Sequence, residues 1–165
     1  MKNLYYTYYQ SPIGIIKIAA TDTFIEELSF VDNQEQIEHG EPGVSEVIHQ
    51  CTEQLIEYFN NKRRVFDLPI HQEGTEFQQK VWKELMKIPF GKTISYIQLA
   101  TKLGDPKVIR AAASANGKNK IAIIVPCHRV IGSNNTLVGY SGGLWRKKFL
   151  VEHEHNLFHG VQTLF

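Results

Sequence analysis

The sequence predicts an α/β protein of the α+β kind. It is expected to have a small N-terminal domain, residues 1–74, with an antiparallel sheet and a helix, followed by a mainly helical C-terminal domain, residues 75–165. Aromatic and β-branched runs separated by turn residues indicate the sheet. Helical spacing and capping patterns dominate the second half, and the sign of the net charge changes near Gly74. At 165 residues and 42% hydrophobic, the chain can bury a sizeable core.

The two predicted domains differ strongly in charge. Residues 1–74 hold 5 Lys/Arg and 12 Asp/Glu, a formal net charge of −7, whereas residues 75–165 hold 13 Lys/Arg and 5 Asp/Glu, a net charge of +8. A basic domain of this kind favours a polyanion such as nucleic acid as partner. The alternative interpretation is that the two domains simply carry solvated faces of opposite charge that attract each other, which would give the same counts of charged residues.

The start of the chain predicts a short antiparallel meander. Its turns are expected at residues 11–14 and 21–22, where proline, glycine and aspartate interrupt the apolar runs. After a polar stretch over residues 32–43, apolar residues at helical spacing predict a helix that stops near residues 60–61; they are Val44, Val47, Ile48, Cys51, Leu55 and Phe59. Cys51 is interpreted as a small buried residue, and residues 63–74 as an extended connection.

Two capping boxes mark helix starts in the second half. Thr75 with Gln78 begins a helix whose apolar residues extend to Ile88 and which Pro89 is expected to end. Ser95 with Gln98 begins a second, short helix.

Gly104 closes that short helix, and Asp105 is expected to cap a third helix that ends at Gly117. Helix, glycine turn and helix form the helix-turn-helix pattern. The third helix is slim because alanine dominates it, and Arg110 shares a face with Ser114. Such a helix suits a DNA groove and close packing in a protein core equally well.

The rest of the chain carries the candidate chemistry. Residues 121–125 are uniformly apolar and predict a buried strand, which would deliver Cys127 and His128 to its end. A turn and a glycine-rich bend at residues 139–143 follow, and then a last helix that ends at residues 152–154.

Several classes of protein are disfavoured. No apolar run is long enough for a membrane span, no signal peptide is evident, and two distant cysteines suit a reducing cytoplasm. Gly91-Lys92-Thr93 resembles the end of a phosphate loop, but Met86 stands where the earlier glycine is required. Adjacent cysteine and histidine side chains diverge, so no metal site is expected; the histidines near the C-terminus are interpreted as solvated surface.

Cys127 is therefore a candidate nucleophile. A thiol reacts when a positive neighbour or a basic histidine favours the thiolate, and both His128 and Arg129 adjoin it. A packed loop cysteine is the equally weighted alternative on this dipeptide alone.

Three motifs in order then resemble one family. They are the helix-turn-helix "SYIQLATKLGDPKVIRAAASANGKN", the loop "PCHRV" and the bend "GYSGG". Together they resemble the methylated-DNA–protein-cysteine methyltransferases, or O6-alkylguanine-DNA alkyltransferases, over residues 75–155. The start of the chain, including "SPIG", is similar to the more variable N-terminal domain of that family.

The resemblance implies a function and the roles of individual residues. Cys127 would accept an alkyl group from O6-alkylguanine, and also from O4-alkylthymine, with His128 as base through a water and Glu154 orienting it. Asn119 would hold the loop, and Tyr96 would displace the target phosphate and assist protonation of the leaving base. The substrate pocket would comprise Val130, Tyr140 and Ser141. The DNA contacts would come from Ser95, Tyr96, Arg110, Ala111, Ser114 and Arg129.

The same resemblance implies double-stranded DNA as partner through its minor groove, a monomer and no cofactor. The attacked atom is stacked inside a duplex, so the nucleotide must rotate out at a cost of a few kcal/mol, which Arg110 would offset by filling the gap. A thioether is no leaving group, so the protein should act once.

Three other functions remain possible on the sequence. One is a non-catalytic alkylation-damage sensor, which the cysteine argues against, and another is a helix-turn-helix transcription regulator, for which the slim helix offers few base-reading side chains. The third is a thiol hydrolase, which would need an oxyanion hole and would turn over. Three positions depart from the family pattern, with Lys120 in place of proline, Ser114 in place of glycine or alanine, and His155 in place of glycine.

Overall fold

The computed structural model describes residues 3–33 and 44–159. The chain divides into two compact units, residues 1–72 and 73–165. Most of the predicted polar stretch, residues 34–43, lies outside the described residues. No helix in the described ranges is long and apolar enough to cross a membrane.

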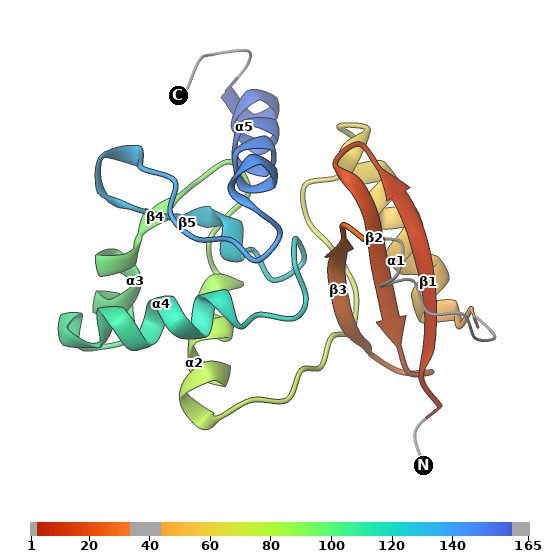
Figure 1. The fold of residues 1–165 in the computed structure, drawn as a ribbon, viewed down its shortest axis with the longest axis horizontal. Coiled ribbons are helices and arrows are strands. Elements are labelled where there is room, and N and C mark those ends of the chain that lie inside the picture. The colour runs from red at the N-terminus through yellow and green to blue at the C-terminus, as the bar shows by residue number, and fades with distance from the viewer. Residues whose placement is uncertain (1–2, 34–43, 160–165) are drawn as a thin grey trace. The chain divides into compact units, whose positions relative to one another are not determined.

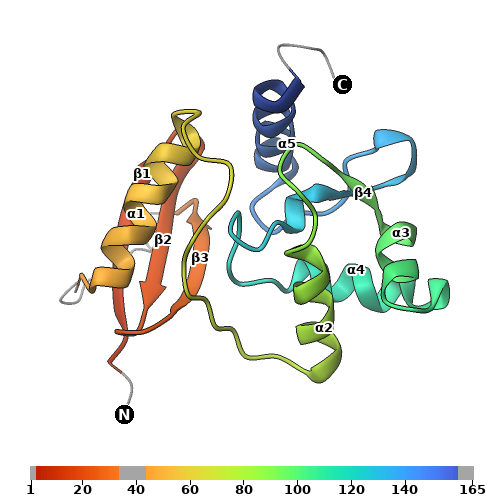
Figure 2. The same ribbon diagram turned by 180° about the vertical axis from the view of Figure 1, so that it is seen from behind.

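The first unit is a three-stranded antiparallel sheet with a helix on one face. Its strands β1 (Tyr5–Ser11), β2 (Gly14–Ala20) and β3 (Ile25–Val31) lie in sequence order, and α1 (Glu46–Phe59) packs across them (Figures 1 and 2). The first turn suits its residues, because Ser11 Oγ accepts from the Ile13 amide at 3.1 Å and Gly14 adopts φ 105°. The predicted meander is confirmed.

Helix α1 begins and ends close to its predicted limits. Ser45 caps it by accepting from the Ile48 amide, and the chain leaves it at Asn60. Cys51 is fully buried, as expected, but Val44 precedes the cap and is 66% exposed. Tyr58, rather than Phe59, is the fully buried aromatic residue of the last turn.

In its described residues, the second unit contains four α-helices around a two-stranded parallel sheet (Figure 1). The helices are α2 (Glu76–Leu85), α3 (Tyr96–Lys102), α4 (Ile109–Gly117) and α5 (Leu144–His159), and the strands are β4 (Ile94–Ser95) and β5 (Val130–Ile131). Three short 3-10 helices, η2 (Pro106–Val108), η3 (Cys127–Arg129) and η4 (Ser133–Asn135), complete the described part of this unit.

Both predicted capping boxes are present. The side chain of Thr75 accepts from the Gln78 amide while Gln78 returns a bond to the Thr75 amide, and Ser95 and Gln98 repeat the arrangement. Helix α2 ends at Leu85, one turn earlier than predicted. The backbone forms a turn after Leu85, although the side chain of Ile88 is still buried, at 4% exposure.

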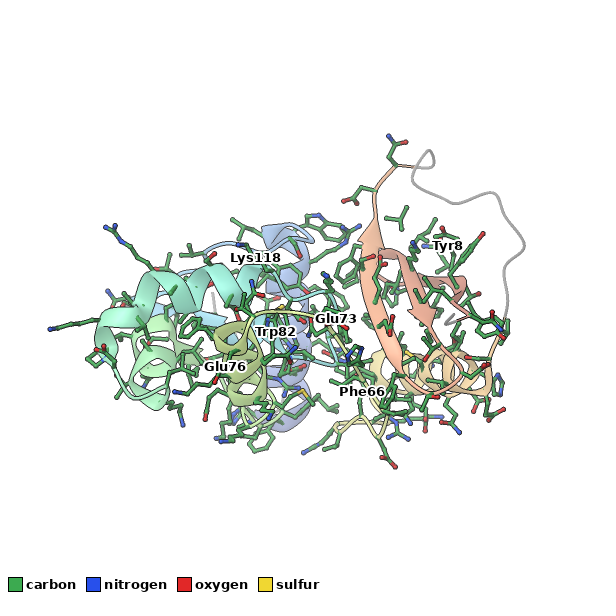
Figure 3. The ribbon with its side chains drawn as sticks, turned by 90° about the horizontal axis from the view of Figure 1, so that it is seen from below. Tyr8, Phe66, Glu73, Glu76, Trp82 and Lys118 are labelled. Atoms are coloured by element: carbon green, nitrogen blue, oxygen red, sulfur yellow. The ribbon has the colours of Figure 1, made fainter. Side chains whose placement is uncertain are left out.

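The helix-turn-helix is formed by α3 and α4. Gly104 between them adopts φ 102°, and Asp105 caps the 3-10 turn η2, so that α4 begins only at Ile109. Small residues let α4 pack closely: Ala115 is 2% exposed, and Trp82 of α2, labelled in Figure 3, donates from Nε1 to the Ala115 carbonyl at 3.0 Å.

The strand predicted over residues 121–125 is wrong. All five side chains are buried, as an apolar run indicates, but the backbone folds into a turn. The Val125 amide bonds to the Ile121 carbonyl at 3.0 Å, and Ile123 adopts φ 69°. Local bonds, together with the Asn119 side chain, satisfy several of the polar backbone groups that a strand would have paired in a sheet.

The last helix is longer than predicted. Instead of ending at residues 152–154, α5 continues to His159, so the histidine that follows Glu154 is helical. Its buried stripe of Lys147, Leu150, Val151 and Glu154 follows helical spacing and carries two ionisable groups into the core of the unit.

Candidate active site

Cys127 opens the 3-10 turn η3, and β5 follows this turn directly. β5 pairs in parallel with β4, with Val130 opposite Ile94. Because α3 begins at Tyr96, immediately after β4, the pairing places the start of the helix-turn-helix beside the turn that carries the cysteine.

Asn119 holds the loop that leads to Cys127. Its Nδ2 lies 3.2 Å from the Ile121 carbonyl, 2.9 Å from the Val125 carbonyl and 3.3 Å from Cys127 Sγ. Its Oδ1 accepts from the Ile121 amide at 3.1 Å. One buried carboxamide therefore fixes both ends of the turn over residues 121–125 and contacts the sulfur.

The Cys127 side chain is almost completely buried, at 5% exposure. Burial raises the pKa of Cys127 above its ordinary value, whereas the hydrogen bond from Asn119 and the charge of Lys147 act in the opposite direction. At neutral pH the sulfur is therefore a thiol, and it becomes nucleophilic only when a base takes its proton.

Glu154 reaches the same cluster from α5 and is 2% exposed. Burial alone would raise the pKa of its carboxyl, but the charges and hydrogen bonds of His128 and Arg129 hold that pKa well below its usual range. Glu154 is therefore an ionised carboxylate that only accepts hydrogen bonds.

His128 is fully buried, and its Nε2 lies 2.8 Å from Glu154 Oε2. Burial lowers the pKa of His128; Glu154 opposes this effect, and the net pKa is below the ordinary value. The imidazole is thus neutral at neutral pH, and Nε2 carries the proton that is donated to Glu154. Nδ1 is buried and has no hydrogen-bond partner within the described ranges, so its lone pair can accept a proton.

The structure corrects the DNA contact expected of Arg129. The side chain is buried, and its guanidinium contacts Glu154 and lies 5.8 Å from the centre of the Phe90 ring. Nη1 donates to the Ile88 carbonyl at 2.6 Å. A guanidinium held in this way cannot reach a phosphate, so Arg129 does not belong to the DNA-contacting set.

Lys147 was missed by the sequence analysis. Its side chain is fully buried, and Nζ donates to the carbonyls of Val138 and Gly139 at 2.7 and 3.1 Å and to Tyr96 Oη at 3.3 Å. Burial lowers the pKa of Lys147 to about 8, although Cys127 acts to raise it. The signal that could have found it is a lysine on the apolar stripe of the last helix, seven positions before Glu154.

Tyr96 faces the same loop from the start of α3. Its hydroxyl donates to the Val138 carbonyl at 3.0 Å, and burial followed by the charge of Cys127 raises its pKa. Tyr96 therefore remains a protonated donor at neutral pH. Ser95, just before it, is occupied as the cap of α3.

The expected pocket residues occupy different environments. Burial, and then the charges of Cys127 and Glu154, raise the pKa of Tyr140 well above its ordinary value, which places its hydroxyl near both groups. Ser141 is exposed on the following turn. Val130 is fully buried in β5.

The solvent face of α4 carries the other predicted contacts. Arg110, Ala111 and Ser114 are exposed, and Lys107 and Lys118 are exposed at the two ends of the same segment. Cations flank a row of small residues, a surface that approaches a polyanion closely. Among the described residues, no group of three or more potential ligands could hold a metal ion.

This geometry describes a cysteine protein in which a thiol, an imidazole and a carboxylate form one buried cluster beside a helix-turn-helix. The family model for 6-O-methylguanine DNA methyltransferase, DNA binding domain, matches residues 76–156. The model for the ribonuclease-like domain of the same methyltransferase matches residues 4–72. The chain belongs to the 6-O-methylguanine DNA methyltransferase family.

Individual relatives agree with the family models. The chain is 41% identical to the methylated-DNA–protein-cysteine methyltransferase of Methanosarcina barkeri, over 93% of this chain and 98% of the relative. It is 41% identical to the constitutive methylated-DNA–protein-cysteine methyltransferase of Bacillus subtilis, over 91% and 94%. The crystal structure of Mycobacterium tuberculosis OGT in complex with DNA superimposes with a TM-score of 0.84 at 40% identity, covering 93% of this chain and 94% of the other.

Proposed function

We propose that this protein repairs DNA by transferring one alkyl group from O6-alkylguanine, and from O4-alkylthymine, in a duplex to Cys127. The observation that carries the proposal is that buried Cys127 is followed in the chain by a neutral, fully buried His128, which is bonded to an ionised Glu154. The names of the relatives and the DNA complex of the Mycobacterium tuberculosis protein support the same reaction.

In the proposed reaction, His128 accepts the thiol proton at Nδ1 while Glu154 holds the imidazole in the tautomer with the proton on Nε2. The thiolate attacks the alkyl carbon, so that an S–C bond forms and the C–O bond to the base breaks. The electron pair of that bond stays with the base, which takes a proton from the Tyr96 hydroxyl. A thioether cannot leave again, and the transfer is therefore stoichiometric.

The DNA partner is proposed to bind through its minor groove against the exposed face of α4. Small side chains at Ala111 and Ser114 permit close approach, and the exposed cations supply affinity independent of sequence. We further propose that the protein acts as a monomer, without a cofactor, in the cytoplasm, where both free cysteines stay reduced.

The decisive experiment measures the intact mass of the protein after incubation with a duplex that contains one O6-methylguanine. We expect wild-type protein to gain a single methyl group on the peptide that holds Cys127, and Cys127→Ser to gain none. Turnover of more than one lesion per molecule, or an unchanged mass, would refute the proposed function. Cys51→Ser is the matched control and should gain the methyl group, because Cys51 is fully buried in the first unit.

Arg110→Ala is expected to separate base rotation from chemistry. Arg110 is exposed on the side of α4 that is proposed to face DNA, and a side chain that fills the duplex would offset part of the few kcal/mol that base rotation costs. Transfer from duplex O6-methylguanine should therefore slow by about tenfold or more, while transfer from free O6-benzylguanine should be unchanged. Single-turnover rates measure both reactions, and equal slowing of the two would remove Arg110 from this role.

A further inference from the structure

Arg129 is buried beside His128 and Glu154 and donates hydrogen bonds from three of its nitrogens. We propose that Arg129 is a positioning residue of the acceptor site, which fixes the Glu154 carboxylate and shares its charge so that His128 is oriented but not protonated. The inference rests on the proposed transfer to Cys127 and adds the residue that sets the protonation state of the base.

The contacts form a fork. Nε donates to Glu154 Oε1 at 2.7 Å and Nη2 to Oε2 at 3.1 Å, so the guanidinium binds both carboxylate oxygens. Oε2 also accepts from His128 Nε2 at 2.8 Å. The third nitrogen, Nη1, is anchored at 2.6 Å to the carbonyl of Ile88 in the turn after α2. The carboxylate that orients the imidazole is itself held by a group with a fixed backbone anchor.

The contact between Arg129 and Glu154 affects the protonation of His128, because several charges act on the imidazole. Three charged groups act on His128, namely Arg129 in its own turn and Glu154 and Lys147 on α5. Two further titratable groups belong to the same region: Cys127 precedes His128 in the turn, and Tyr140, on the loop before α5, is affected by the charges of Cys127 and Glu154. Glu154 favours the imidazolium, whereas the charges of Arg129 and Lys147 disfavour it. An imidazolium has no lone pair and cannot accept the thiol proton.

Without Arg129, the full charge of the carboxylate would act on one partner, His128. The imidazole would then hold its proton to a higher pH, and the thiol would have no base near neutrality. The proposed role therefore differs from simple packing, because a packing defect slows transfer equally at every pH whereas loss of this charge slows it most in acid.

The test compares single-turnover methyl transfer at saturating duplex for wild type, Arg129→Gln and Arg129→Lys, from about pH 5.5 to about pH 9. Lys83→Gln removes an exposed cation on α2 and is the matched charge control. In the pH–rate profile of Arg129→Gln, we expect the acidic limb, where the rate falls with falling pH, to move to higher pH by about one unit. Relative to wild type, the variant would then be about tenfold slower at the acidic end than at the alkaline end. Arg129→Lys, which keeps the charge, should stay close to the wild-type limb.

Parallel profiles for Arg129→Gln and wild type, or an equal shift in Arg129→Lys, would overturn the inference. Absence of any methyl gain by wild type would instead overturn the proposed function. If Arg129→Gln does not fold, ¹⁵N NMR of wild type and Arg129→Lys decides, with His128 assigned among the 7 histidines by His128→Gln. A neutral imidazole protonated on Nε2 at neutral pH is expected in both, and an imidazolium or the Nδ1–H tautomer would refute the role.

Discussion

Glu154→Gln is expected to slow alkyl transfer to Cys127 by about 10⁴-fold, the effect of neutralising the carboxylate of a comparable triad. The amide cannot hold the tautomer of His128 as an ionised carboxylate does across 2.8 Å, and it leaves the buried Arg129 guanidinium without a counter-charge. Breaking a buried ion pair in this way costs about 3–5 kcal/mol, so the free energy of unfolding should fall by a similar amount. Single-turnover transfer and urea denaturation measure the two effects.

Glu152→Gln provides the control for that experiment. It makes the same substitution on the same helix, at a half-buried position away from the cluster. Its unfolding free energy should lie within about 0.5 kcal/mol of wild type, as is usual for substitutions outside such networks, and its transfer rate should be unchanged. Similar losses in both variants would mean that α5, rather than the carboxylate at 154, accounts for the effect.

Asn119→Leu is expected to have the second-largest effect. Leucine fills a similar volume but removes the donors to the Val125 carbonyl and to Cys127 Sγ and the acceptor for the Ile121 amide. Each buried group left unsatisfied costs about 1–3 kcal/mol, so the loss of stability should reach about 3–5 kcal/mol. The Asn119 hydrogen bond also lowers the pKa of Cys127, so its loss should slow transfer at neutral pH.

Chemical denaturation and single-turnover transfer test Asn119→Leu against Lys120→Ala. Lys120 is the exposed neighbour that stands where the family pattern has proline. We expect its removal to change stability by less than about 0.5 kcal/mol. If Asn119→Leu is as stable as Lys120→Ala, the turn over residues 121–125 does not depend on the carboxamide.

Much of the fold could be predicted from local patterns because the energies involved are local. The capping boxes at Thr75 and Ser95 identified helix starts to the residue, since a cap is formed by residues three positions apart. The meander was predictable for the same reason. Residues 121–125 were not, because an apolar run indicates burial and not the path of the backbone. The Asn119 carboxamide, two residues before the run, supplies bonds to the turn that an apolar pattern does not show.

The residues of the candidate site also differ in whether local sequence could predict them. Adjacent Cys127 and His128 are visible in the sequence, and motif order supplied Glu154 and Asn119. The partners of Arg129 and Lys147 were not visible, because both bind groups on other elements, such as the Ile88 and Val138 carbonyls. Arg129 was assigned to the DNA contacts through the family resemblance, although tertiary structure directs its side chain inward.

His128 and Glu154 lie far apart in the sequence, and this separation limits when the Cys127 thiol can be activated. His128 and Glu154 are 26 positions apart and meet only when α5 has docked against the cysteine turn. In a chain that is still folding, or in one whose α5 has undocked, Cys127 therefore lacks the His128–Glu154 pair and has the reactivity of an ordinary cysteine. The thiol can react only once, and it therefore gains its base only when the tertiary structure around it is complete.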